Sequence, residues 1–87
     1  MKLLRDTVSS LRLDSVLSVG FSLSRSKAAE AVTSGKVQVN WADWQKPDRQ
    51  VVQGDVLTLR GLGKCVLEEV GNQTKKGRVF ITVKRYL

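Results

Sequence analysis

Residues 11–40 decide the fold, and they read LRLDSVLSVGFSLSRSKAAEAVTSGKVQVN. Apolar residues recur at intervals of three and four in the first third of this stretch, at Leu13, Val16, Leu17, Gly20 and Phe21. This spacing gathers apolar side chains on one side of a helix. We therefore predict a helix over residues 11–20, with Ser9 or Ser10 as its N-cap and Gly20 as its end.

A second helix is predicted over residues 25–34. Ser24 is a good N-cap, and Gly35 stands where a helix commonly ends on a left-handed residue. The face suited to close packing against the first helix is made of small residues, Ala28, Ala29, Ala31 and Val32. Polar and apolar residues then alternate over residues 36–40, which predicts a half-buried strand.

The remaining segments predict further strands and complete an α+β fold. Residues 2–8 form an edge strand or a lead-in, and residues 41–50 form a loop or a hairpin. A turn at Gly54-Asp55 precedes three more expected strands, over residues 56–60, 64–70 and 78–86, with a polar loop at 71–77. We expect one domain over residues 1–87, in which two N-terminal helices pack on a small, mostly antiparallel sheet.

The chain carries an excess of positive charge. Fifteen Lys and Arg residues against eight Asp and Glu residues give a net charge of +7. Seven of the basic and two of the acidic residues lie in residues 60–87, so the excess is concentrated there. A small folded domain with such an excess usually meets a polyanion, and the alternative is a basic surface that only contacts water.

Composition excludes several classes of site. The chain has no histidine and one cysteine, Cys65. A disulfide within the chain and catalysis by a serine–histidine or cysteine–histidine pair are therefore excluded, and a zinc site has too few ligands. Cys65 lies in an apolar run and is expected to be a core thiol. We expect no metal, no cofactor and no enzymatic activity, because no paired acid and base can be identified.

The sequence also bears on the compartment. No stretch approaches the ~20 apolar residues that a membrane span needs. No signal peptide is visible, because charged residues follow the first four positions at once. We expect a cytoplasmic protein, or one of the plastid stroma if the source is a plant.

The starts of the two predicted helices are candidate phosphate sites. Arg25 and Lys27 stand in the first turn of the second helix, where the helix dipole already places positive charge. Phosphate would compensate these cations, bound also by the Ser24 hydroxyl and free backbone N–H groups. The alternative is that both side chains point into water. Arg12 begins the first helix in the same way, and we interpret Asp14 as a helix-end acid rather than as a residue that orients Arg12.

A polar stripe would extend this surface along the first strand. Lys36, Gln38 and Asn40 share one face of that strand, and Lys46 would continue it. The stripe could equally be the wet face of a sheet. Lys75 and Lys76 lie at a loop tip, where they form either a second RNA contact or a solvated loop.

Two tryptophans follow this strand. We predict that Trp41 is mainly structural, because it comes directly after a strand whose apolar residues face the core. Stacking of Trp41 or Trp44 on unpaired bases is the alternative.

A specific series runs through residues 12–60: Arg12-Leu13-Asp14, Leu17, Gly20, Ser24-Arg25, Ala28, Val32, Gly35, Val37-Gln38-Val39-Asn40, Lys46-Pro47 and Gly54-Asp55. In order and spacing these residues resemble the S4-like RNA-binding domains, a family found in a ribosomal protein, tyrosyl-tRNA synthetases and pseudouridine synthases. The resemblance implies the αL RNA-binding motif, a groove made by the two helices and the first strand that binds structured RNA. It also implies an S4-like core at about residues 11–60, followed by a basic hairpin at 64–87.

One departure narrows the resemblance. Many members have glycine after the Asn of this strand, where this chain has Trp41. The pair Asn40-Trp41, with Arg60-Gly61-Leu62-Gly63-Lys64 and a basic final hairpin, is similar to the C-terminal domain of the YlmH-type proteins. Cyanobacterial and plastid members of that group are labelled photosystem II S4-domain proteins. This resemblance implies that the chain is the C-terminal part of a longer protein.

Two functions are therefore weighed. The first is an RNA-binding module, monomeric, that acts on ribosomal RNA or tRNA at the ribosome, in translation or in the handling of stalled ribosomes. Its expected RNA contacts are Arg12, Ser24, Arg25, Lys27, Lys36, Gln38, Asn40 and Lys46. The second is a protein-interaction module that docks through its sheet. An exposed apolar patch around Trp41, Trp44 and Phe80 would favour the second.

Overall fold

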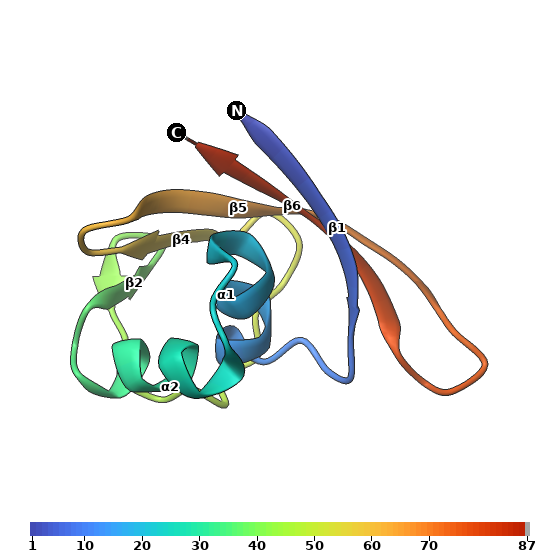
Figure 1. The fold of residues 1–87 in the computed structure, drawn as a ribbon, viewed down its shortest axis with the longest axis horizontal. Coiled ribbons are helices and arrows are strands. Elements are labelled where there is room, and N and C mark those ends of the chain that lie inside the picture. The colour runs from blue at the N-terminus through green and yellow to red at the C-terminus, as the bar shows by residue number, and fades with distance from the viewer. Residues whose placement is uncertain (87) are drawn as a thin grey trace.

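The computed structural model describes residues 1–86, which form two helices and a single sheet (Figure 1). The helices are α1 (Leu13–Phe21) and α2 (Arg25–Thr33). The strands are β1 (Lys2–Val8), β2 (Val37–Val39), β3 (Ala42–Asp43), β4 (Val56–Leu59), β5 (Gly63–Gln73) and β6 (Val79–Tyr86). The two predicted helices, and the change from helical to strand periodicity after Gly35, are confirmed.

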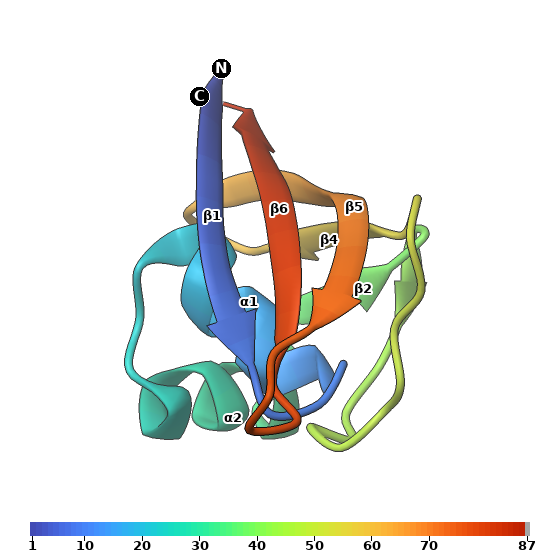
Figure 2. The same ribbon diagram turned by 90° about the vertical axis from the view of Figure 1, so that its right-hand side faces the viewer.

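The sheet has the strand order β1-β6-β5-β4-β2-β3, and every described pairing in it is antiparallel. Residues 2–8 are thus an edge strand, since β1 pairs only with β6. Figure 2 shows β1 and β6 side by side, so that the start of β1 lies close to the end of β6. Both helices lie on one side of the sheet (Figure 1), so the predicted α+β architecture is confirmed.

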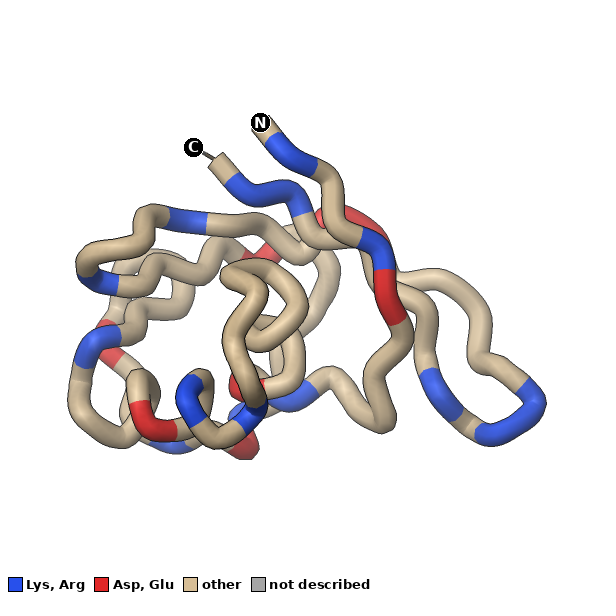
Figure 3. The backbone as a smooth tube through the Cα atoms, in the orientation of Figure 1, with Lys and Arg blue, Asp and Glu red and all other residues tan. Residues whose placement is uncertain are grey.

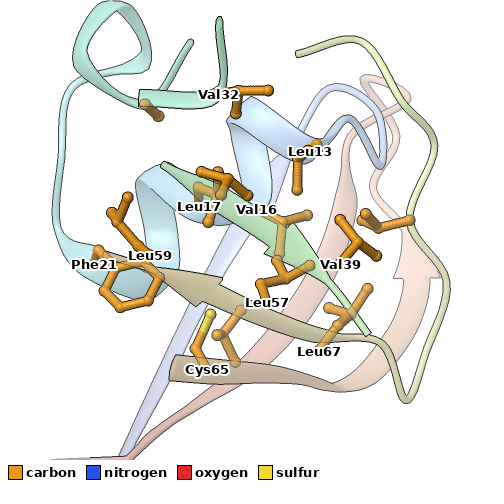
Figure 4. Close-up of a cluster of buried hydrophobic side chains, with 14 of the residues drawn as sticks. Leu13, Val16, Leu17, Phe21, Val32, Val39, Leu57, Leu59, Cys65 and Leu67 are labelled. Carbon is orange, nitrogen blue, oxygen red and sulfur yellow. The ribbon is translucent and has the colours of Figure 1, made fainter. Parts of the chain in front are cut away.

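The core lies between α1 and the sheet (Figure 4). The apolar stripe of α1 is buried there, and Leu13 and Leu17 are fully buried in the same cluster as Leu57 and Leu67 of the sheet. Helix α2 contributes only small residues to this core, Ala28 and Val32. Burying a leucine or valine side chain stabilises the fold by about 1.5–3 kcal/mol, so the α1 stripe supplies much of the driving force.

The start of α1 differs from the prediction. Arg12, and neither Ser9 nor Ser10, is the N-cap residue, and its side chain makes no capping hydrogen bond. Backbone carbonyls of the loop between β3 and β4 replace the cap. The Leu13 N–H donates to the Arg49 carbonyl at 2.8 Å, and the Asp14 N–H donates to the Pro47 carbonyl at 3.1 Å. Ser9 and Ser10 therefore do not cap the helix, although local sequence rules favour serine as an N-cap.

Gly20 does not end α1, which continues through Phe21 to a left-handed Ser22 with φ of 55°. Gly20 is instead a packing residue. A Cβ there would lie 2.8 Å from Sγ of Cys65 and 3.1 Å from Cγ1 of Val83. Cys65 is the expected core thiol, because it is fully buried and burial raises its pKa to about 12. The helix thus approaches the sheet at a point where only glycine fits.

Residues 41–50 contain a short hairpin rather than only a loop. Strand β3 folds back on β2 through a two-residue reversal, Asn40-Trp41, and Trp44 beyond it packs partly against the core. Trp41 is 66% exposed, so the burial on which its predicted structural role depends is absent, and that part of the prediction is wrong. The reversal turns the ring away from the face that Val37 and Val39 bury.

Candidate nucleic-acid interface

The N-termini of the two helices meet at one buried carboxylate. Asp14 is only 3% exposed, and its two oxygens accept hydrogen bonds from Nε and Nη2 of Arg12 at 3.0 and 3.1 Å. Nη2 of Arg25, from the start of α2, lies 3.5 Å from the same carboxylate. We call Arg12, Asp14 and Arg25 the Asp14 cluster. The interpretation of Asp14 as only a helix-end acid is wrong, because it orients Arg12.

The Asp14 carboxylate remains charged despite its burial. Burial alone would raise the pKa of Asp14, but the hydrogen bonds and charge of Arg12, together with the charge of Arg25, outweigh it and lower that pKa. The same contact raises the pKa of Arg12. The cluster therefore holds two guanidinium groups in a defined position while leaving them accessible, since the Arg25 side chain is 54% exposed.

The lowered pKa of Asp14 predicts a loss of stability in acid. A carboxylate whose folded-state pKa lies below its ordinary value of 3.8 stabilises the fold above that pH, and this contribution is lost as the pH falls through the lowered pKa. The difference in unfolding free energy between the parent and Asp14→Asn should thus be constant down to about pH 4 and shrink below it. Urea titrations at neutral pH and at about pH 3 measure this difference. A difference that does not change with pH would contradict a stabilising role for the charge.

Helix α2 begins as predicted. The Ser24 hydroxyl caps it by accepting a hydrogen bond from the Lys27 N–H at 3.1 Å. The first turn of α2 contains no acidic residue, and Lys27 makes no ion pair within residues 1–86. The positive end of this helix therefore carries two cations, and within residues 1–86 the only carboxylate paired with either of them is that of Asp14. Because Ser24 is used as a cap, it contributes to the surface mainly by holding this helix start in place.

Lys36 and Gln38 lie in a different place from the Asp14 cluster. They line a hollow of about 220 Å³ with Arg60, beyond the other end of α2. The Gln38 amide is also tied to the carboxylate of Asp43 at 3.2 Å. Arg60 was missed by sequence reasoning. Val37 pairs with Leu59, so the residues next to them, Lys36 and Arg60, lie side by side. The Arg60 N–H donates to the Lys36 carbonyl.

Asn40 is held within the fold. Its amide nitrogen donates to the Asp55 carboxylate at 3.0 Å, and its amide oxygen accepts the Val56 N–H at 2.9 Å. These bonds fasten the β2–β3 hairpin to the turn before β4, so Asn40 positions backbone. Lys46 lines a shallow hollow with Trp44, whose ring carries the guanidinium of Arg49 at 4.1 Å from its centre. The predicted contacts thus fall into separate groups rather than one cluster.

The sequence of this chain matches a protein-family model. The model of the S4 domain matches residues 11–57, which is more than half of the chain. The chain belongs to the S4 domain family. The S4 match covers α1, α2, β2, β3 and the start of β4.

One curated relative of this S4 chain is the ribosome-associated protein quality control protein P2 of Bacillus subtilis (strain 168). The two are 42% identical over 80 residues, which is 92% of this chain and 31% of the relative. The chain therefore spans about a third of the length of the relative that it matches. The similarity reaches well beyond the S4 match, so it includes part of the sheet made by β1, β5 and β6.

Two of the basic residues outside the S4 match, Lys75 and Lys76, lie away from the helix starts. Lys75 and Lys76 lie on the loop between β5 and β6, which projects away from both helices (Figure 3). Arg78, at the base of this loop, is bound to β1: its Nε and Nη2 donate to the hydroxyl and the carbonyl of Thr7 at 2.9 and 2.6 Å. Arg78 therefore fixes the hairpin to the edge strand, while Lys75 and Lys76 are exposed.

Two further features bear on chemistry. Within residues 1–86, no helix is long and apolar enough to cross a membrane. The same described residues contain no group of three or more His, Cys, Asp or Glu side chains that could hold a metal ion.

Proposed function

We propose that this chain is an RNA-binding module that recognises structured RNA through the Asp14 cluster and the basic residues around it. The observation that carries the proposal is the buried Asp14 carboxylate, which holds Arg12 and Arg25 at the starts of two neighbouring helices. Two arginines fixed in this way match the bidentate geometry of phosphate oxygens. An exposed pair without such a support would lose more side-chain entropy on binding.

The remaining predicted contacts take different roles in this proposal. Lys27 adds a cation beside the Asp14 cluster, and Ser24 holds its helix start. Lys36 and Gln38, with Arg60, form a second place for the RNA backbone, and Lys46 a third. Asn40 acts through the backbone that it positions. Several phosphate contacts at different places suit the recognition of an RNA shape rather than of a base sequence.

The relative in Bacillus subtilis is named as ribosome-associated. This name, together with the S4 family membership and the net charge of +7, supports ribosomal RNA or tRNA as the partner of this chain, in translation or in the handling of stalled ribosomes. In this proposal the chain binds RNA as a cytoplasmic monomer and catalyses no reaction.

The alternative of a protein-docking sheet is less well supported. Trp41 and Phe80 are both exposed, but Phe80 lies on β6 and Trp41 on the β2–β3 hairpin. Strands β5 and β4 stand between these two places in the sheet, and Trp44 is half-buried. The three aromatic residues therefore do not form the continuous patch that this alternative needs.

Binding should depend steeply on salt, and Arg25→Ala should reduce that dependence. If about four to six phosphates are neutralised, the slope of log affinity against log salt should be roughly −3 to −5. Arg25→Ala should make this slope shallower by about one and weaken different structured RNAs to a similar extent, about three- to tenfold. A salt titration of binding to a structured ribosomal RNA fragment measures both quantities.

Lys75→Ala is the matched control, because it also removes one exposed cation but lies on the distal loop. It should affect binding less than Arg25→Ala. The reverse order would move the RNA contact to the β5–β6 hairpin. A parent protein that binds structured RNA no better than an uncharged protein of similar size would refute the function itself.

A further inference from the structure

The reversal between β2 and β3 is made by two residues in the left-handed region, Asn40 with φ of 50° and Trp41 with φ of 67°. Val39 pairs with Ala42, so the two residues form the whole loop. Two-residue hairpin loops of this kind favour Asn-Gly, since the second position suits a residue without a β-carbon. Tryptophan at that position strains the backbone.

The fold compensates the strain at Asn40 but not at Trp41. Asn40 gains two side-chain hydrogen bonds, to Asp55 and to the Val56 N–H. Trp41 makes no side-chain hydrogen bond within residues 1–86, and its ring is 66% exposed. Trp44, three residues later, differs from Trp41, because it packs partly on the core and its ring contacts the guanidinium of Arg49. A strained position thus presents a large aromatic ring to solvent.

The backbone that carries this ring is held in a defined place. The Asn40 N–H donates to the Val56 carbonyl at 2.8 Å, and the Asn40 side-chain oxygen accepts a hydrogen bond from the Val56 N–H. A rigid support lowers the entropy that an aromatic residue loses when it binds a ligand. Strained residues cluster at ligand-binding sites, so the uncompensated strain at Trp41 indicates that this ring binds a ligand.

We propose that Trp41 stacks on an unpaired nucleobase of the bound RNA, an inference that rests on the RNA-binding function proposed above. Every base offers a flat face to an indole ring, and stacking tolerates any sequence. The net charge of +7 favours a polyanionic partner over an apolar protein surface. Base stacking by Trp41 adds a contact to single-stranded nucleotides, in addition to the phosphate contacts of the Asp14 cluster.

The test compares four proteins, the parent, Trp41→Gly, Trp41→Phe and Arg25→Ala, on two synthetic RNAs. One RNA is a hairpin with an unpaired loop, and the other is a fully paired duplex. Trp41→Gly should raise the melting temperature, because it restores the residue that the loop favours, and yet weaken binding of the hairpin by about fivefold or more. It should leave duplex binding unchanged, because a fully paired duplex offers no unpaired base. It should also leave the salt slope unchanged, because no charge is lost. Trp41→Phe should keep most of the affinity without the gain in stability.

The outcomes separate this inference from the function on which it rests. If Trp41→Gly binds the hairpin as the parent does while Arg25→Ala weakens it, stacking is refuted, RNA binding stands, and Trp41 becomes a candidate for protein docking. If Trp41→Gly melts at a lower temperature, the ring is structural and the inference is also refuted. If the parent binds neither RNA, the proposed function fails first.

Discussion

Asp14→Asn is expected to weaken binding of structured RNA by about tenfold, even though it makes the protein more positive. The change removes a negative charge from a chain of net charge +7, and counterion release alone would then favour tighter binding. The Asp14 carboxylate, however, holds the guanidinium of Arg12 through two hydrogen bonds and attracts that of Arg25. A charge-assisted hydrogen bond contributes about 1.5–3 kcal/mol, and tenfold in affinity corresponds to about 1.4 kcal/mol.

Glu68→Gln is the matched control for charge. Glu68 is exposed on β5 and makes no ion pair within residues 1–86, so its substitution changes the net charge equally without releasing an arginine. Glu68→Gln should leave binding unchanged or slightly tighter. The measurement is the affinity of parent and both variants for one ribosomal RNA fragment at a single salt concentration. An equal increase in affinity in both variants would show that Asp14 only repels the RNA through its charge and does not position the arginines.

Gly20→Ala is expected to destabilise the fold by about 1–3 kcal/mol, which lowers the melting temperature by roughly 4–8 °C per kcal/mol in a domain of this size. Helix propensity alone predicts the opposite, because alanine is better than glycine inside a helix by about 1 kcal/mol. The new methyl group would meet Sγ of Cys65 at 2.8 Å and Cγ1 of Val83 at 3.1 Å. Both neighbours are buried and have little room to move.

A double variant tests the cause. Cys65→Ala removes the nearer of the two atoms, so adding it to Gly20→Ala should cost less than the sum of the two single changes. Gly71→Ala is the control, since its Cβ would meet Phe80 at an ordinary contact distance of 3.4 Å. Thermal unfolding of the four variants and the parent measures these effects. A Gly20→Ala protein that is more stable than the parent would rule out close packing at this site.

Features that depend on neighbouring residues could be predicted from the sequence. The periodicity of residues 13–21 and the alternation after Gly35 are local, and both appear as α1 and β2. The cap of α1 could not be predicted in this way, because its carbonyl acceptors, on Pro47 and Arg49, come from a distant loop. The role of Gly20 depends on a strand more than forty residues later, which brings Cys65 against the helix.

The same distinction holds for the candidate site. Arg12, Arg25 and Lys27 could be identified because cations at a helix start oppose the helix dipole, which is a local property. The contact between Asp14 and Arg25 joins two helices and follows only from their packing. Arg60 joins Lys36 through strand pairing. The exposure of Trp41 follows from the turn, which moves its ring off the face that alternation assigns to it.

The pairing of β1 with β6 has a consequence for how this protein folds. These are the first and last strands along the chain, and β1 has no other partner in the sheet. Their contact closes a loop of nearly the whole chain, and closing so long a loop costs entropy before any contact repays it. During synthesis β1 must wait unpaired until β6 has left the ribosome, while the helices and the inner hairpins form from near neighbours. We therefore expect the domain to fold from its middle outward, with β1 and β6 pairing last.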